Sequence, residues 1–166
     1  QAALTAGRAG LEVLLAEQDF VFGGALAGHT GHEWMAKTLA ELESLPNVRM
    51  MPRSSVYGTY DHGVYGMLER KTDHIAHQTD KPRQVLWRVY SKQAIIATGA
   101  TERPIAFANN DRPGIMLAGA VATYIRRFGV TPGQKIVAFG ADQAQLADLA
   151  ASAHAQGVEV RVLTPE

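Results

Sequence analysis

The sequence has no cysteine, which excludes disulfide bonds, iron–sulfur ligation and thiol catalysis within its 166 residues. It has no excess of charge of either sign, because 16 basic residues balance 16 acidic ones. A balanced chain lacks the basic footprint that nucleic acids and anionic membranes require. Apolar runs of the roughly 20 residues that a membrane span needs are also missing. We expect a cytoplasmic protein that binds neither nucleic acid nor a membrane.

The residues that are present indicate a globular chain, with 46% hydrophobic and 19% charged residues. Apolar spacing and turn signals predict a series of helices and strands. The predicted helices cover residues 1–10, 33–45, 119–128 and 141–156. The predicted strands cover residues 11–17, 47–51, 54–61, 64–71, 84–91, 93–97, 135–139 and 158–163. We expect Trp34 and Trp87 in the core.

Strands that alternate with helices favour parallel sheets covered by helices. We therefore predict an α/β fold: a three-layer, FAD/NAD(P)-binding (Rossmann-like) fragment with a small antiparallel β-sheet insertion at residues 54–91. Residues 1–107 would form a partial first dinucleotide-binding domain, and residues 108–166 a partial second nucleotide-binding-like domain. A doubly wound domain normally begins with a central strand, whereas this chain begins on a helix. We expect a fragment without the first strand and its glycine-rich turn.

An acidic residue ends the strand predicted at residues 11–17. In dinucleotide-binding units an Asp or Glu at the end of the second strand accepts hydrogen bonds from the adenosine ribose hydroxyls. Glu17 has this type and position, and a solvated strand-end glutamate is the alternative. Gly23 and Gly24 follow it. Paired glycines let the main chain approach a diphosphate with no Cβ in the way, and an ordinary flexible loop is the alternative.

A run of small residues, AIIATG, ends the strand predicted at residues 93–97. Gly99 has no Cβ and Ala97 has only a methyl side chain, so the backbone of this segment can lie close to a ligand. Thr98 can donate a hydroxyl hydrogen bond. The alternative is a buried strand that leaves its sheet through a glycine. The candidate cofactor-binding residues are Glu17, Gly23, Gly24, Thr98 and Gly99.

The second strand–helix–strand unit, residues 135–163, has the spacing of a nucleotide unit but a different turn. After Gly140 the turn carries Asp142 and Gln145 where further glycines are usual. A side chain there blocks a pyrophosphate, and an acid repels it. We favour a structural unit over a site for NAD(P)H hydride transfer, although Glu166 stands near the position of a ribose-binding acid.

The six histidines are candidate metal ligands. His29 and His32 are three residues apart, as are His74 and His77. Both pairs lie in predicted loops and lack a third ligand, so we expect no metal site. No nucleophile signature is present, and we assign no catalytic residue.

Several segments together resemble the α subunit of heterotetrameric sarcosine oxidase, from Glu17 to about Asp142. They are SSVYGTYDHGVYGMLERKTDH, LWRVYSKQAIIATGATERPIAFANNDRPGIMLAGAVATYIRRFGV and PGQKIVAFGADQ. The ATG strand is shared by many flavoproteins with two dinucleotide domains that resemble disulfide reductases. The flanking ERP and NDRPGIMLAGA narrow the resemblance to relatives of sarcosine and opine oxidases.

The resemblance implies two nested nucleotide-binding domains in a complex that oxidises sarcosine to glycine. Oxygen would be the acceptor, giving peroxide, and the one-carbon unit would pass to tetrahydrofolate. The partners would be the other subunits of a heterotetramer. The cofactors would be NAD in a non-redox role, with Glu17 as its ribose-binding acid, and FAD or FMN in the full complex. The alternative is that this stretch binds no cofactor by itself.

Three other functions stay open from the sequence. One is the alpha subunit of an opine or hydroxyproline dehydrogenase-like complex. The second is a non-catalytic nucleotide-binding interface module, and the third is an NAD(P)H-dependent reductase that uses residues 135–163.

Overall fold

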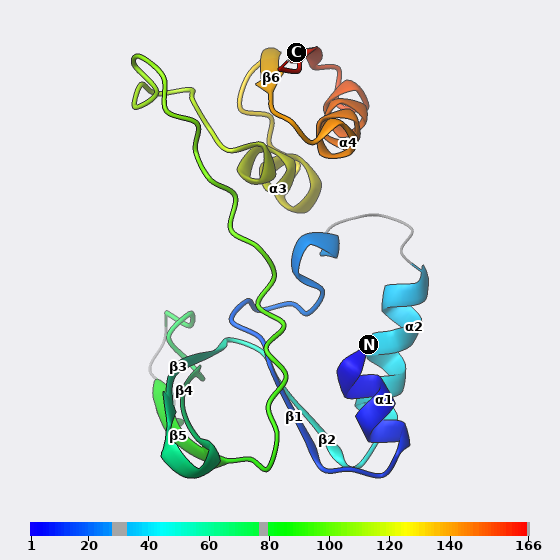
Figure 1. Ribbon diagram of the computed structural model, residues 1–166, viewed down its shortest axis with the longest axis vertical. Coiled ribbons are helices and arrows are strands. Elements are labelled where there is room, and N and C mark those ends of the chain that lie inside the picture. The colour runs from blue at the N-terminus through cyan, green and yellow to red at the C-terminus, as the bar shows by residue number, and fades with distance from the viewer. Residues whose placement is uncertain (28–32, 77–79, 166) are drawn as a thin grey trace. The chain divides into compact units, whose positions relative to one another are not determined.

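A computed structural model describes residues 1–27, 33–76 and 80–165. The chain divides into two compact units, the first extending to Gly99 and the second beginning at Ala100. The first unit contains α1 (Ala2–Arg8), β1 (Val13–Ala16), η1 (Gly24–Leu26), α2 (Glu33–Ser44), β2 (Val48–Met51), β3 (Ser54–Tyr60), η2 (Asp61–Gly63), β4 (Val64–Arg70) and β5 (Gln84–Tyr90) (Figure 1). The second contains α3 (Ala118–Phe128), β6 (Lys135–Phe139), α4 (Gln143–His154) and β7 (Glu159–Leu163). The predicted α/β class is confirmed.

The first unit contains a parallel pair of strands, β1 and β2, whose register runs from Val13 opposite Val48 to Ala16 opposite Met51. The helices α1 and α2 contact these strands and each other. Asn47 closes α1, because its side-chain amide donates to the carbonyl of Gly7 at 3.0 Å. A parallel pair covered by helices places the carboxyl ends of both strands at one edge.

An antiparallel sheet of order β3–β4–β5 follows the parallel pair. It matches the insertion predicted from alternating residues, and Met67 at its centre has 0% exposure. On the same face, the indole Nε1 of Trp87 donates to Glu69 at 2.8 Å. The Arg49 guanidinium of β2 lies 4.5 Å from the centroid of the Trp87 ring. These contacts join the antiparallel sheet to the parallel pair.

Residues 93–97 do not form the strand that their apolar sequence predicts. The segment is extended, but none of the described strands pairs with it. Ile95 and Ile96 are 73% and 83% exposed. The prediction was wrong because β-branched apolar residues favour a strand only where a neighbour accepts and donates the ladder hydrogen bonds. In the described chain β1 pairs with β2 alone.

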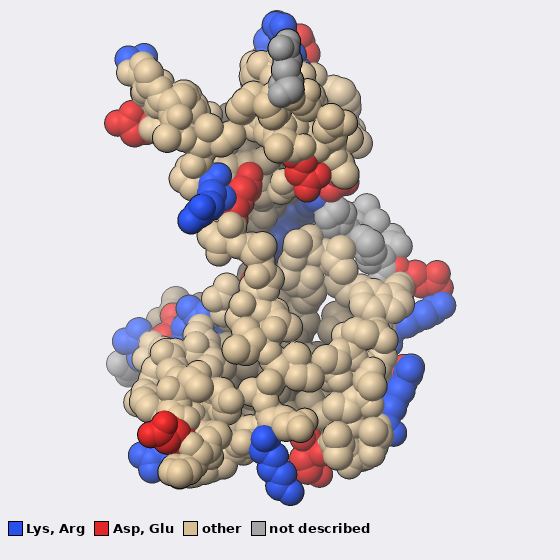
Figure 2. Space-filling model, viewed as in Figure 1, with Lys and Arg blue, Asp and Glu red and all other residues tan. Residues whose placement is uncertain are grey.

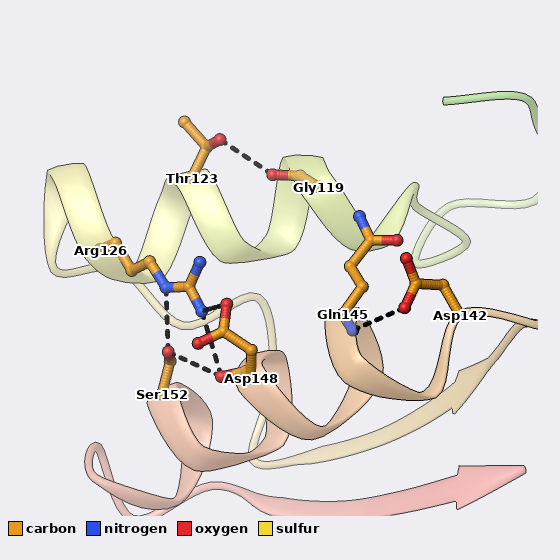
Figure 3. A network of polar contacts seen from close by, with 7 residues as sticks. All are labelled: Gly119, Thr123, Arg126, Asp142, Gln145, Asp148 and Ser152. Atoms are coloured by element: carbon orange, nitrogen blue, oxygen red, sulfur yellow. Dashed lines mark hydrogen bonds and ion pairs between the residues drawn. The ribbon is translucent and has the colours of Figure 1, made fainter. Parts of the chain in front are cut away.

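The second unit packs α3 and α4 with the parallel pair β6–β7. Its buried core residues are Val121, Ile125, Ala138, Leu146, Leu149, Ala153 and Val158. Arg126 ties the two helices together, since its Nε donates to the Ser152 hydroxyl at 2.9 Å and its Nη2 lies 2.5 Å from an Asp148 carboxylate oxygen (Figure 3).

A glutamate from the segment before α3 caps that helix. The two carboxylate oxygens of Glu102 accept from the backbone N–H groups of Ala118 and Gly119, at 3.0 and 2.7 Å. A Cβ on Gly119 would lie 2.8 Å from a Glu102 oxygen, so glycine makes room for the cap. Glu102 thereby satisfies two of the N–H groups that a helix start leaves without partners.

Removing this cap should loosen the start of α3. We expect Glu102→Ala to destabilise that turn by about 1–2 kcal/mol, because two N–H groups lose a charged acceptor. Hydrogen exchange of the amides at the start of α3 measures the effect. Glu102→Gln is the control, since it keeps one acceptor oxygen without the charge and should lose less. Equal exchange in the alanine variant and the parent would refute the capping role.

The surface carries charges of both signs. In Figure 2 basic and acidic side chains lie singly or in mixed groups on the face shown, without a large patch of one sign.

Trp34 is 54% exposed, so its predicted place in the core was wrong. It is the second residue of α2, in the first turn, whereas the buried residues Thr38 and Leu42 lie in later turns. Of the described helices, none is long and apolar enough to cross a membrane.

Candidate functional site

Glu17 lies at the carboxyl end of β1, held by backbone bonds on both sides. Its N–H donates to the carbonyl of Met51 at 3.0 Å, and its carbonyl accepts from the N–H of Ser54 at 2.8 Å. The half-buried carboxylate accepts from the N–H of Asp19 at 3.0 Å through Oε1. Within the described chain no hydrogen bond engages Oε2, so one oxygen of a fixed carboxylate is available to a ligand.

The predicted glycine pair lies on the connection between β1 and α2. Gly23 and Gly24 have φ of +122° and +54°, in the region that favours glycine. They start the short helix η1, where the N–H of Leu26 donates to the Gly23 carbonyl at 3.0 Å. A Cβ on Gly23 would lie 2.6 Å from the Met35 sulfur, whereas the space over Gly24 is open. The Gly24 backbone can therefore be approached closely from outside.

Thr98 and Gly99 lie on the exposed extended segment that follows β5. Gly99 has φ of +71° and open space where a Cβ would stand. Among the described residues, no hydrogen bond joins Thr98 or Gly99 to Glu17 or to the glycine pair. The structure thus brings Glu17, Gly23 and Gly24 onto one connection and leaves Thr98 and Gly99 on a separate, solvent-facing one.

Sequence reasoning missed a polar hollow next to Glu17. Its volume is about 320 Å³, and it is lined by Gln18, Asp19, Phe20, Arg53, Arg70, Asp73 and His74. Arg53 and Arg70 come from the β2–β3 turn and the end of β4. One signal could have found Arg53, because it follows β2, whose carboxyl end shares an edge with that of β1.

Asp73 in this hollow is a structurally engaged carboxylate. The side-chain amide of Gln84 donates to it, and the Nε of Arg83 does so at 3.0 Å. The hydrogen bond from Gln84 and the charges of Arg83 and Arg70 lower the pKa of Asp73 against the opposing effect of burial. Asp73 is therefore held by Gln84 and Arg83 at the edge of the hollow.

The turn of the second unit is occupied by the chain itself. Asp142 is the N-cap of α4, and its carboxylate accepts from the N–H of Gln145 at 3.0 Å (Figure 3). An anion there would meet a fixed negative charge at the helix start. This geometry supports a structural role for residues 135–163. Glu166 lies outside the described residues.

The described chain contains no group of three or more metal-ligating side chains. His29, His32 and His77 lie outside the described residues. His74 lines the hollow beside Glu17.

Comparison with curated proteins finds three sarcosine oxidase alpha subunits. That of Rhizobium meliloti (strain 1021) is 40% identical over 96% of this chain and 17% of its own length. Those of Corynebacterium sp. strains P-1 and U-96 are 38% and 37% identical over 91% and 81% of this chain, and 17% and 15% of their own lengths. No family model matches the chain.

Among solved structures, L-proline dehydrogenase from P. horikoshii superposes with a TM-score of 0.72. The match covers 98% of this chain and 32% of that one at 20% identity, which shows a shared fold. The chain spans about one-sixth of the length of the curated relatives, 15–17%. Its sequence places it in the family of sarcosine oxidase alpha subunits, as a stretch of such a subunit.

Proposed function

We propose that this stretch forms part of a dinucleotide-binding domain in the alpha subunit of an oxidoreductase complex. The observation that carries the proposal is Glu17, a fixed carboxylate with one available oxygen at the carboxyl end of a parallel strand. Ligands of open α/β sheets bind at these ends. A carboxylate only accepts hydrogen bonds, so it suits the hydroxyls of an adenosine ribose.

The glycine connection would lie along the diphosphate of the same ligand. Gly24 presents an open backbone at positive φ, and Gly23 allows the turn that carries it. Thr98 and Gly99 would border the site from the segment after β5, where Gly99 also presents an open backbone. The ligand would be NAD in a role without hydride transfer, with FAD or FMN elsewhere in the complex.

The reaction of the complete enzyme would be the oxidation of sarcosine to glycine. Oxygen would accept the electrons, giving hydrogen peroxide, and the one-carbon unit would pass to tetrahydrofolate with the other subunits. The family relationship supports this assignment. The residues of this stretch would bind and support rather than carry out the chemical step.

Glu17 provides the direct test of the binding site. We expect Glu17→Ala, in the complete alpha subunit, to weaken NAD binding by about 1–3 kcal/mol, or 5- to 150-fold, since one or two charged hydrogen bonds are lost. Isothermal titration with NAD, FAD and FMN identifies the ligand and measures the change. Glu12→Ala, at the exposed position before β1, is the matched control and should leave affinity unchanged. Unchanged affinity in the Glu17 variant would remove Glu17 from the site.

Substrate profiling of the assembled enzyme tests the proposed reaction. Peroxide formation from sarcosine, and none from octopine, is expected. Oxidation of octopine but not sarcosine would instead indicate an opine dehydrogenase-like subunit. Nucleotide binding without turnover of any amine would indicate a binding module.

A further inference from the structure

The hollow beside Glu17 is lined by charged, polar and aromatic side chains that can contact one part of a dinucleotide. We propose that it takes the adenine base and that Arg53 supplies the guanidinium plane on which the base stacks. This inference rests on the proposed function, because Glu17 would hold the ribose to which the base is attached. The inference adds a contact between Arg53 and the adenine base, and it predicts that the site prefers nucleotides that carry adenine.

Arg53 occupies a backbone position that favours glycine. It follows Pro52 in the two-residue turn between β2 and β3, and its φ is +55°. A turn with proline first and a positive φ second usually carries glycine there, because a Cβ strains the left-handed conformation. The positive φ alone assigns no role, since His62 and Asn109 share it, so the case for Arg53 depends on the contacts of its side chain.

Hydrogen bonds on both sides fix this conformation. The N–H of Arg53 donates to the Asp19 carbonyl at 2.8 Å, and the Arg53 carbonyl accepts from the N–H of Arg70 at 3.0 Å. The next residue, Ser54, donates its N–H to the carbonyl of Glu17 at 2.8 Å. The turn that carries Arg53 is therefore bonded directly to Glu17 and to the connection after it.

The guanidinium of Arg53 already lies over an aromatic ring. It lies 5.1 Å from the centroid of the Phe20 ring, and both side chains line the hollow. Arg70 also lines the hollow, and its side chain is fixed there because Nη2 donates to the carbonyl of Gln18 at 2.7 Å. A planar guanidinium held against an aromatic ring is a platform for another flat ring, because delocalised cations stack on π faces.

The charge of the hollow favours a neutral base over a phosphate. Its lining has two arginines and two aspartates, Arg53, Arg70, Asp19 and Asp73. Glu17 lies directly beside it in the chain, so a 2′-phosphate on the ribose would meet a carboxylate. Its volume of about 320 Å³ is at the lower end of ligand pockets, which suits one end of a larger ligand.

The experiment measures nucleotide affinity in the complete alpha subunit. The probes are NAD, AMP, NADP and nicotinamide mononucleotide, titrated against the parent and the Arg53→Gly and Arg53→Lys variants. Arg53→Gly should weaken NAD and AMP about 5- to 100-fold, the range for one base stacked on a side chain. Arg53→Lys should lose nearly as much, because it keeps the charge but not the plane. Nicotinamide mononucleotide has no adenine, and its affinity should not change.

A second turn provides the matched control. His62 has φ of +60° at the other end of β3, so His62→Gly relieves similar strain away from the hollow. Neither glycine variant should speed hydrogen exchange in β3, and only Arg53→Gly should weaken AMP. Unchanged AMP affinity in Arg53→Gly, with affinity lost in Glu17→Ala, would overturn the role of Arg53 and leave the proposed function standing. Unchanged affinity in both variants would overturn the proposed function itself. NADP binding as tight as that of NAD would overturn the expected repulsion between a 2′-phosphate and the Glu17 carboxylate.

Discussion

Leu149→Ala is expected to lower the free energy of unfolding of the second unit by about 2–5 kcal/mol. Leu149 is 2% exposed and belongs to the buried cluster between α3, α4 and the β6–β7 pair. The substitution removes buried methyl groups and leaves a cavity that the close-packed surroundings fill only in part. This loss is a large fraction of the total, because a unit of this size is only marginally stable.

Hydrogen exchange resolved by peptide measures this loss in the complete subunit. Amides of α4 and β6 should exchange faster in Leu149→Ala, whereas those of β3–β5 should not, because the packing of Leu149 lies within the second unit. Leu163→Ala is the control, with the same chemical change at a side chain that is 40% exposed. Equal protection in Leu149→Ala and Leu163→Ala would contradict the assigned core.

Local patterns predicted most of the elements, because their causes lie in neighbouring residues. The strand predicted at residues 135–139 coincides with β6, and the helix predicted at 33–45 ends one residue later than α2. Alternation predicted the antiparallel sheet, since one of its faces is buried. The place of Glu17 at the end of a strand was predicted in the same way, and its role in binding stays a prediction.

Contacts between distant residues were not predictable, and they explain the misses. Residues 93–97 have the composition of a strand, but pairing depends on a neighbour that composition cannot supply. Glu102 caps a helix that starts 16 residues later, a role with no local signature. Arg53 differs from these two, because its position after β2 is a signal that could have placed it at the same sheet edge as Glu17.

Glu69→Ala should have a comparably large effect on the first unit. Glu69 is 7% exposed, and its carboxylate accepts from Trp87 at 2.8 Å and pairs with Lys71 at 2.6 Å. Alanine would leave the indole N–H without its acceptor and remove the charge that faces Lys71. We expect a loss of about 2–4 kcal/mol, the sum of the charged hydrogen bond to Trp87 and the partly exposed ion pair with Lys71.

The matched variants separate these two contributions. Glu69→Gln keeps an acceptor for Trp87 and removes the charge, so it should lose less than alanine. In Trp87→Phe the donor is absent, so replacing Glu69 should then cost less than in the parent, a coupling that a double-mutant cycle measures. Hydrogen exchange of the β4 and β5 amides measures the loss of stability in each variant. Additive effects of the two substitutions would show that the hydrogen bond contributes nothing.

The charge of Glu69 also makes this sheet sensitive to acid. Burial opposes ionisation, but hydrogen bonds from Lys71 and Trp87 and the charges of Lys71 and Arg49 outweigh it, so the pKa of Glu69 is lowered. A carboxylate with a lowered folded pKa contributes stability above its unfolded pKa, which is 4.5, and loses it as the pH falls through the folded value. The difference in stability between the parent and Glu69→Gln should therefore be largest near neutral pH and shrink below about pH 4. A difference that stays constant down to pH 3 would mean that the ionised carboxylate does not stabilise the sheet, and that Glu69 acts only as an acceptor for Trp87.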